Sequence, residues 1–292
     1  MHDNDPHNAL GVALRKHAVV WAAGIAAVIA VAALFASSSS ARTDGAQSKK
    51  AGDSAKPTIV LVHGAWADGS SWNSVTERLQ ADGYTVAVPP NPLRSLSGDS
   101  TYLASFLGTI SGPIILAGHS YGGAVITNAA TGNANVKALV YVDAYIPDQG
   151  QSLVQLTGPG SCFYVQNLGD VFNFVPIAGA PSNDVDVYVK PDVFPGCFAN
   201  GLPARKGAVL AAEQRPITTA ALNESSGVPA WKTIPSWAVV GLDDHVIPPA
   251  SQLAMANNAG ATITEIRAPH LSMLSDPGAV TKVIEHAAKA TS

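Results

Sequence analysis

The sequence predicts an α/β fold: a mostly parallel sheet of about six strands, with helices on both faces and an inserted cap. Short apolar runs alternate with segments of helical periodicity on either side of one long irregular stretch. Such alternation is typical of a parallel sheet that is covered on both faces. Hydrophobic residues make up 47% of the 292 residues and charged residues 13%. This composition indicates a chain that buries a large core rather than a disordered one.

The N-terminal part is expected to lie outside this fold. Residues 18–36 are apolar and uncharged, and a stretch of about 19 residues is close to the length of a membrane-spanning helix. Small residues follow, as at a signal-peptidase site. We therefore expect residues 1–41 to be an export signal or, if uncleaved, a membrane anchor, and residues 42–56 a flexible linker. Residues 57–292 would then be secreted or held on the outer face of the cytoplasmic membrane.

The first half of the folded domain follows a strand–helix rhythm. The run Thr58-Ile-Val-Leu-Val62 is typical of a strand buried on both faces. Trp72, Val75 and Leu79 then recur at helical spacing before Gly83. On the same reasoning we expect strands at residues 84–88, 113–117 and 138–142, with helices around 103–110 and 124–130.

The rhythm breaks at residues 147–232, which are rich in Gly and Pro, and then returns. This segment is too long for an ordinary loop and is expected to form a cap over the site. Strands at 236–240 and 261–266 and helices at 251–258 and about 280–287 complete the domain. The cap's aromatic residues would either line an apolar pocket or form the cap's own core. Cys162 and Cys197, both in the cap, are expected to pair in an exported protein, with two free thiols as the alternative.

A candidate nucleophile lies between a predicted strand and helix. The segment Gly118-His-Ser-Tyr-Gly122 matches G-x-S-x-G, whose sharp turn holds the serine hydroxyl above a helix N-terminus. Ser120 is therefore the expected nucleophile. In a turn of this kind, two backbone N–H groups bind the developing oxyanion. One belongs to Tyr121, directly after the serine, and the other to Ala65 in the loop after the first strand.

The candidate base and acid follow late strands. Of the eight histidines, only His245 and His270 lie on such loops, and His270 directly follows the strand at 261–266. His270 is therefore the expected general base. Asp143, Asp243 and Asp244 are the candidate acids. Asp244 is the expected one, because neighbouring side chains in an extended loop point in different directions and Asp243 would face away.

Four segments resemble the α/β-hydrolase superfamily. They are Val60-Leu-Val-His-Gly-Ala-Trp66, Gly118-His-Ser-Tyr-Gly-Gly123, Gly241-Leu-Asp-Asp-His-Val-Ile-Pro248 and Ala268-Pro-His270. Within it the chain is similar to the compact group of plant methylesterases, hydroxynitrile lyases and bacterial esterase relatives. The resemblance implies an α/β-hydrolase fold, the triad Ser120, His270 and Asp244, and oxyanion donors at Ala65 and Tyr121. The lyases carry a lysine after the catalytic histidine, whereas Leu271 stands here, so ester hydrolysis is favoured.

The expected function is that of a carboxylesterase-like serine hydrolase, which cleaves an ester through an acyl-enzyme with no cofactor and no metal. Its expected partner is a small apolar or aromatic ester. The net charge of −4, without a run of Lys and Arg, argues against a nucleic-acid binder. Membrane contact is expected only through the N-terminal segment if it is retained. The alternatives are a hydroxynitrile lyase or perhydrolase on the same triad, or a ligand-binding protein that kept the fold without catalysis.

Overall fold

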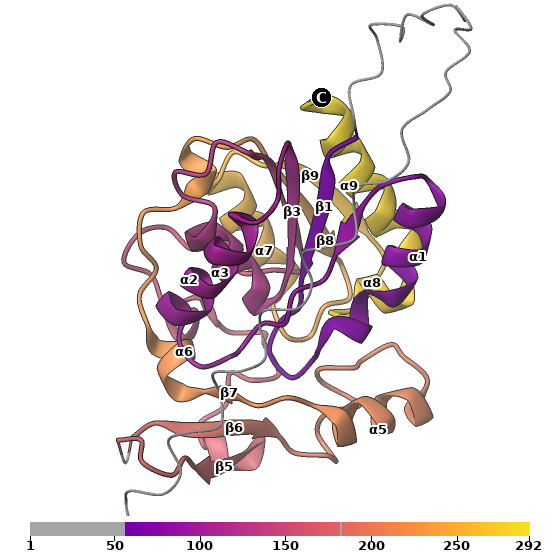
Figure 1. Ribbon diagram of the computed structural model, residues 1–292. Coiled ribbons are helices and arrows are strands. Elements are labelled where there is room, and N and C mark those ends of the chain that lie inside the picture. The colour runs from indigo at the N-terminus through magenta and orange to yellow at the C-terminus, as the bar shows by residue number, and fades with distance from the viewer. Residues whose placement is uncertain (1–55, 182) are drawn as a thin grey trace, which may run out of the picture. The chain divides into compact units, whose positions relative to one another are not determined.

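The computed structural model describes residues 56–181 and 183–292 and contains a six-stranded sheet with helices on both faces (Figure 1). The strand order is β2-β1-β3-β4-β8-β9, and every neighbouring pair is parallel. The predicted fold class is thus confirmed. The strands are β1 (Thr58–Val62), β2 (Val86–Ala87), β3 (Ile114–His119), β4 (Val136–Val142), β8 (Ser236–Gly241) and β9 (Thr262–Ile266).

Two layers of helices bury the faces of this sheet (Figure 1). Helices α1 (Asn73–Ala81) and α9 (Pro277–Ala290) lie on one face, and the opposite face is covered by α2 (Leu96–Leu107), α3 (Tyr121–Ala129) and α7 (Pro249–Asn258). Coverage on both sides explains why every residue of β3 is buried. In α9 the apolar stripe that indicated the helix is the buried one: Val280, Val283, Ile284 and Ala287.

Two elements differ most from the sequence prediction. The strand expected at 84–88 contains only Val86 and Ala87, which pair with β1 at the sheet edge before Pro89 and Pro90 follow. The helix expected near 103–110 begins at Leu96, because the Ser95 hydroxyl accepts the Gly98 N–H and caps it. It ends at Leu107, so Ile110 lies beyond it.

The cap contains more regular structure than its sequence indicated. Between residues 147 and 232 the chain forms a three-stranded antiparallel sheet with the order β5-β6-β7. This sheet and α5 lie at the carboxyl ends of the main strands (Figure 1). The cap elements are α4 (Leu153–Leu156), η2 (Leu168–Asp170), β5 (Phe172–Pro176), β6 (Val185–Val189), α5 (Ala204–Glu213), β7 (Ile217–Thr218), α6 (Thr219–Asn223) and η3 (Ala230–Lys232).

A disulfide closes one side of the cap. It joins Cys162 to Cys197, whose Cα atoms are 5.8 Å apart, as the sequence predicted. The cap's aromatic residues divide into two sets. Phe163, Phe172, Phe194 and Phe198 are buried, whereas Tyr164 and Phe174 are exposed.

Within the described ranges, no helix combines the length and the apolar character that crossing a membrane requires. The apolar stretch at 18–36, with the export or anchor role expected for it, lies outside the described residues.

Candidate active site

Ser120 lies at a sharp turn from β3 into α3. Its backbone has φ 52° and ψ −122°, a conformation that non-glycine residues rarely adopt and that is common at functional sites. The flanking glycines leave room for this turn. A Cβ atom on Gly118 would lie 2.5 Å from the Gly122 carbonyl oxygen, and one on Gly122 would lie 2.6 Å from the Val62 carbonyl oxygen. The sequence therefore forms the turn that G-x-S-x-G predicted.

The loop after β1 packs directly against this turn. A Cβ atom on Gly64 would lie 2.7 Å from Ser120 Cβ, so only glycine permits the approach. His63 holds the loop, because its Nδ1 bonds to the Gly64 carbonyl at 2.9 Å and its Nε2 accepts the Asn91 N–H at 3.0 Å. Burial lowers the pKa of His63 to about 4, which keeps the ring neutral and able to accept.

The two expected oxyanion donors flank the serine. Ala65 directly follows Gly64, and Tyr121 is the first residue of α3. N–H groups in the first turn of a helix have no intrahelical acceptor. Trp66, next along the loop, has φ 55°. Its backbone N–H donates to the Arg215 carbonyl at 3.0 Å and its indole N–H to the Val187 carbonyl at 2.8 Å, so the cap fixes this loop from above.

His270 reaches the serine turn from a distant strand. It follows β9, three strands and roughly 14 Å from β3. Its loop nevertheless lies beside the residue before Ser120, because His119 Nε2–H donates to the His270 carbonyl at 2.9 Å. The His270 side chain is fully buried, and its Nε2 has no hydrogen-bond partner among the described residues. Burial lowers the pKa of His270 to about 3, so the imidazole is neutral and can accept a proton.

Asp244 is the carboxylate that faces this imidazole. His270 Nδ1–H donates to Asp244 Oδ2 at 2.8 Å, and both side chains are fully buried. The other N–H groups around the carboxylate come from Val246 and Ile247, which donate to Oδ1, and from Gln252, which donates to Oδ2. Burial raises the pKa of Asp244, and the backbone N–H groups oppose that shift. Four N–H donors suit a carboxylate that must stabilise an imidazolium.

The two other candidate acids lie elsewhere. Asp243 is exposed. Asp143 is fully buried at the end of β4 with φ 44°. Its Oδ1 accepts the Gly241 N–H at 2.8 Å, and its Oδ2 has no partner within the described residues. Burial raises the pKa of Asp143 well above its usual range, and the nearby Asp244 adds to the shift. Asp143 therefore holds the end of β8, a contact that the sequence did not reveal.

Aromatic side chains cover the imidazole and the loop after β1. The Phe198 ring lies 5.2 Å from the His270 ring. Trp66 contacts Phe163, Phe172 and Phe198, with ring centroids 5.1 to 5.8 Å apart. Trp72, the first residue of the helical pattern after this loop, is fully buried in the core. The structure thus brings Ser120, His270, Asp244 and Ala65 to one end of the sheet, below an aromatic cap surface. Among the described residues, no hydrogen bond joins Ser120 to His270, and such bonds commonly tighten only when substrate binds.

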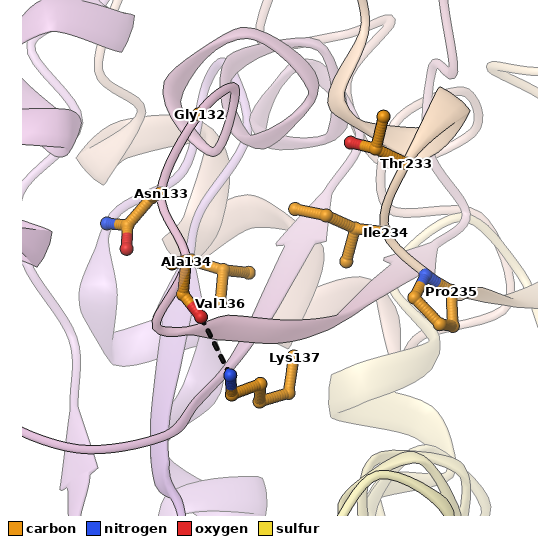
Figure 2. Close-up of a pocket in the computed structure, with 8 residues that line it drawn as sticks. All are labelled: Gly132, Asn133, Ala134, Val136, Lys137, Thr233, Ile234 and Pro235. Carbon is orange, nitrogen blue, oxygen red and sulfur yellow. Dashed lines mark hydrogen bonds between the residues drawn. The ribbon is translucent and has the colours of Figure 1, made fainter.

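A separate surface hollow of about 420 Å³ lies at the opposite end of the sheet, where β4 and β8 begin (Figure 2). Its one charged side chain, Lys137, donates to the nearby Ala134 carbonyl at 2.8 Å. None of the predicted site residues lines this hollow, which lies away from Ser120. Across the part of the chain that the structure describes, no three His, Cys, Asp or Glu side chains are grouped as metal ligands would be.

Comparisons with known proteins agree with this fold. The model of the alpha/beta hydrolase family matches residues 59–283. A carbendazim hydrolyzing esterase from a Nocardioides species is 38% identical over 111 residues, which is 34% of this chain and 46% of that protein. A pyrethroid hydrolase from Sphingobium faniae superposes with a TM-score of 0.63 at 23% identity, covering 80% of this chain and 98% of the other. A methylesterase from Arabidopsis does so with a TM-score of 0.65 at 18% identity, covering 80% and 99%.

Proposed function

Because the chain belongs to the alpha/beta hydrolase family, we propose that it is a serine hydrolase that cleaves a carboxylic ester through an acyl-enzyme. The observation that carries this proposal is the buried pair of His270 and Asp244, joined at 2.8 Å, on a loop that contacts the residue before Ser120. A neutral base, a carboxylate behind it and a serine on a sharp turn are the parts that acyl transfer requires.

The proposed reaction has two steps. In the first, His270 Nε2 takes the Ser120 proton while the hydroxyl oxygen attacks the ester carbonyl, and the alcohol leaves with that proton. Asp244 stabilises the imidazolium through Nδ1–H. In the second, His270 activates a water that releases the acid. The Ala65 and Tyr121 N–H groups hold the oxyanion in both steps, and each such donor contributes about 3 kcal/mol to the transition state. The route uses neither a cofactor nor a metal.

The substrate class that we propose is a small apolar or aromatic ester. Trp66, Phe163, Phe172 and Phe198 form a buried aromatic cluster, and its Phe198 ring packs on the His270 ring. Aromatic and aliphatic groups gain most from burial against such side chains. The esterase, the pyrethroid hydrolase and the methylesterase named above are consistent with this class.

The test is hydrolysis of a short p-nitrophenyl ester by the wild-type protein and by Ser120→Ala. We expect the variant to lose activity by a factor of at least about 10³ while its circular dichroism and unfolding midpoint remain unchanged. A folded variant that retains wild-type turnover would exclude Ser120 as the nucleophile. A cyanohydrin assay run in parallel separates the alternatives, because lyase activity well above esterase activity would favour a hydroxynitrile lyase.

We also propose that the protein acts outside the cytoplasm, on the basis of the apolar stretch at residues 18–36. N-terminal sequencing of the mature protein tests this. A start near residue 42 would indicate a cleaved signal, and a start at Met1 in a membrane fraction would indicate an anchor. A start at Met1 in the soluble cytoplasmic fraction would contradict the proposal.

A further inference from the structure

We infer that the Cys162–Cys197 disulfide is a positioning element of the active site, which holds the loop carrying Asp244 and the ring that packs on His270. The inference rests on the proposed function, since it concerns the same acid and base. The disulfide is more than a covalent link inside the cap, because the segments around Cys162 and Cys197 both contact the active site.

The segment around Cys162 binds the loop that carries Asp244, here called the acid loop, just after that residue. The backbone N–H of Cys162 donates to the His245 carbonyl at 2.8 Å. The hydroxyl of its neighbour Ser161 donates to the Val246 carbonyl at 2.6 Å, and both side chains at this contact are buried. The carbonyl groups of the two residues that follow Asp244 are therefore bound by the cap.

The segment around Cys197 binds the same loop at the residues on either side of Asp244. The Asn200 side-chain N–H donates to the Asp243 carbonyl at 2.7 Å. The ring of His245 contacts the Gly196 carbonyl through Nδ1 at 3.4 Å. Gly196 directly precedes Cys197, and Asn200 follows it by one turn. Residues on both sides of Asp244 are thus held by cap segments that the disulfide joins.

Each cysteine is also directly followed by an aromatic residue at the site. Phe163 and Phe198 pack on Trp66 with ring centroids 5.1 and 5.6 Å apart, and Phe198 lies 5.2 Å from His270. The disulfide therefore joins two segments whose rings both pack on Trp66, and one of these rings also packs on the imidazole. The two cysteines are 35 residues apart in the sequence, and the disulfide links their segments covalently in addition to the backbone.

Without the disulfide, each segment would be held by a few hydrogen bonds and by its aromatic contact. The acid loop and the Phe198 ring would then relax, and the imidazole would lose both its orientation and part of its cover. Misplacement of catalytic groups by about 1 Å typically costs 10²-fold in rate. We therefore expect the loss of the disulfide to lower kcat/KM by about ten- to a hundredfold.

The experiment compares the full-length protein with Cys162→Ala/Cys197→Ala and with Arg94→Ala. Arg94 is a matched control, because it ties the cap to the main domain through Asp186 and the Pro216 carbonyl, away from the acid loop. Each variant is assayed on p-nitrophenyl butyrate from pH 4 to 9, with circular dichroism and an unfolding midpoint recorded in parallel. The charged and titratable groups that face His270 are Asp244 and His119, with Asp143 acting through Asp244.

We expect the cysteine variant to fold and to lose about ten- to a hundredfold in kcat/KM. The acid limb of its pH–activity profile should move toward the ordinary histidine pKa, because the imidazole becomes less buried. Arg94→Ala should keep both the rate and the limb. A folded cysteine variant with unchanged rate and pH profile would overturn the inference, and so would equal losses in both variants. If the cysteine variant does not fold, Asn200→Ala is assayed instead, because it keeps the disulfide. It must show a smaller loss of kcat/KM with the same shift of the acid limb. An unchanged pH–activity profile would overturn the inference.

Failure of the proposed function is distinguishable, because wild-type protein would then show no ester hydrolysis at all.

Discussion

Gly64→Ala is the change that most sharply separates the proposed active site from the rest of the fold. It adds one methyl group to the loop that carries the oxyanion donor Ala65. That methyl would lie 2.7 Å from Ser120 Cβ, 2.9 Å from the His119 carbonyl oxygen and 3.1 Å from the His119 ring. Two of these atoms belong to the rigid turn at the end of β3, so neither can rotate away.

The size of the effect follows from this geometry. Ordinary contacts between carbon atoms lie at about 3.5–4.0 Å, so the loop and the serine turn must separate by roughly 1 Å. A displacement of this size at reacting groups costs about 10²-fold in rate, which equals about 2.7 kcal/mol in the activation free energy. Overpacking should also lower the free energy of unfolding by about 1–3 kcal/mol.

The assay is kcat/KM for p-nitrophenyl butyrate at a temperature at which both proteins are folded. The control is Gly278→Ala in the first turn of α9, where the nearest atom to the new methyl, Asp276 Oδ1, is 3.7 Å away. It should keep full activity and gain some stability, since alanine is the better helix former. The account would be refuted if Gly64→Ala kept more than half of the wild-type kcat/KM, because the loop would then not abut the nucleophile.

Three further predictions follow from the same contacts. Asp244→Asn should lower kcat by about 10⁴-fold. Asp143→Asn should lower kcat by less than about tenfold, because Asp143 bonds to Gly241 and not to His270. Steady-state kinetics that show the reverse order would assign the acid to Asp143. Burial lowers the pKa of His270 from the ordinary histidine value of 6.5 to about 3, so the neutral base persists as the pH falls. The kcat/KM should therefore be level from about pH 8 to pH 5, and a loss of activity centred near pH 6.5 would contradict this. Removing the disulfide, whose cysteines are 35 residues apart, should lower the free energy of unfolding by up to about 4 kcal/mol in urea titrations, and a change below about 1 kcal/mol would show that the closed loop contributes little.

Local patterns in the sequence were sufficient to predict the main sheet and the sharp turn at Ser120. A buried parallel strand is a continuous apolar run, and β1 and β3 read as such because both of their faces are covered. Ser120 was recognisable because its turn needs glycines at fixed positions, and the close approaches at Gly118 and Gly122 show why. The choice of Asp244 over Asp243 depended on alternation in the loop, and their opposite burial agrees with it.

Contacts between distant segments could not be predicted in the same way. The cap sheet was missed because β5 exposes four of its five residues, so it lacks the alternation that indicates a strand. The packing of Phe198 on His270 brings a cap residue against the loop after β9, and no local sequence pattern indicates such a contact. The hydrogen bond from Gly241 to Asp143 depends on the pairing of β4 with β8. The short β2 could not be separated from its flanks, because Tyr84 and Val88 are apolar but lie outside the paired segment.

Labelling with a fluorophosphonate probe tests the central claim most directly. Such a probe reacts with a serine only when a base and an oxyanion hole activate it. The account predicts one probe molecule per chain, located on Ser120 by peptide mass spectrometry, with labelling lost in His270→Ala although that variant keeps its serine. Absence of labelling in the folded wild-type protein, or labelling on a different serine, would contradict the proposal that Ser120 is the nucleophile of a hydrolase.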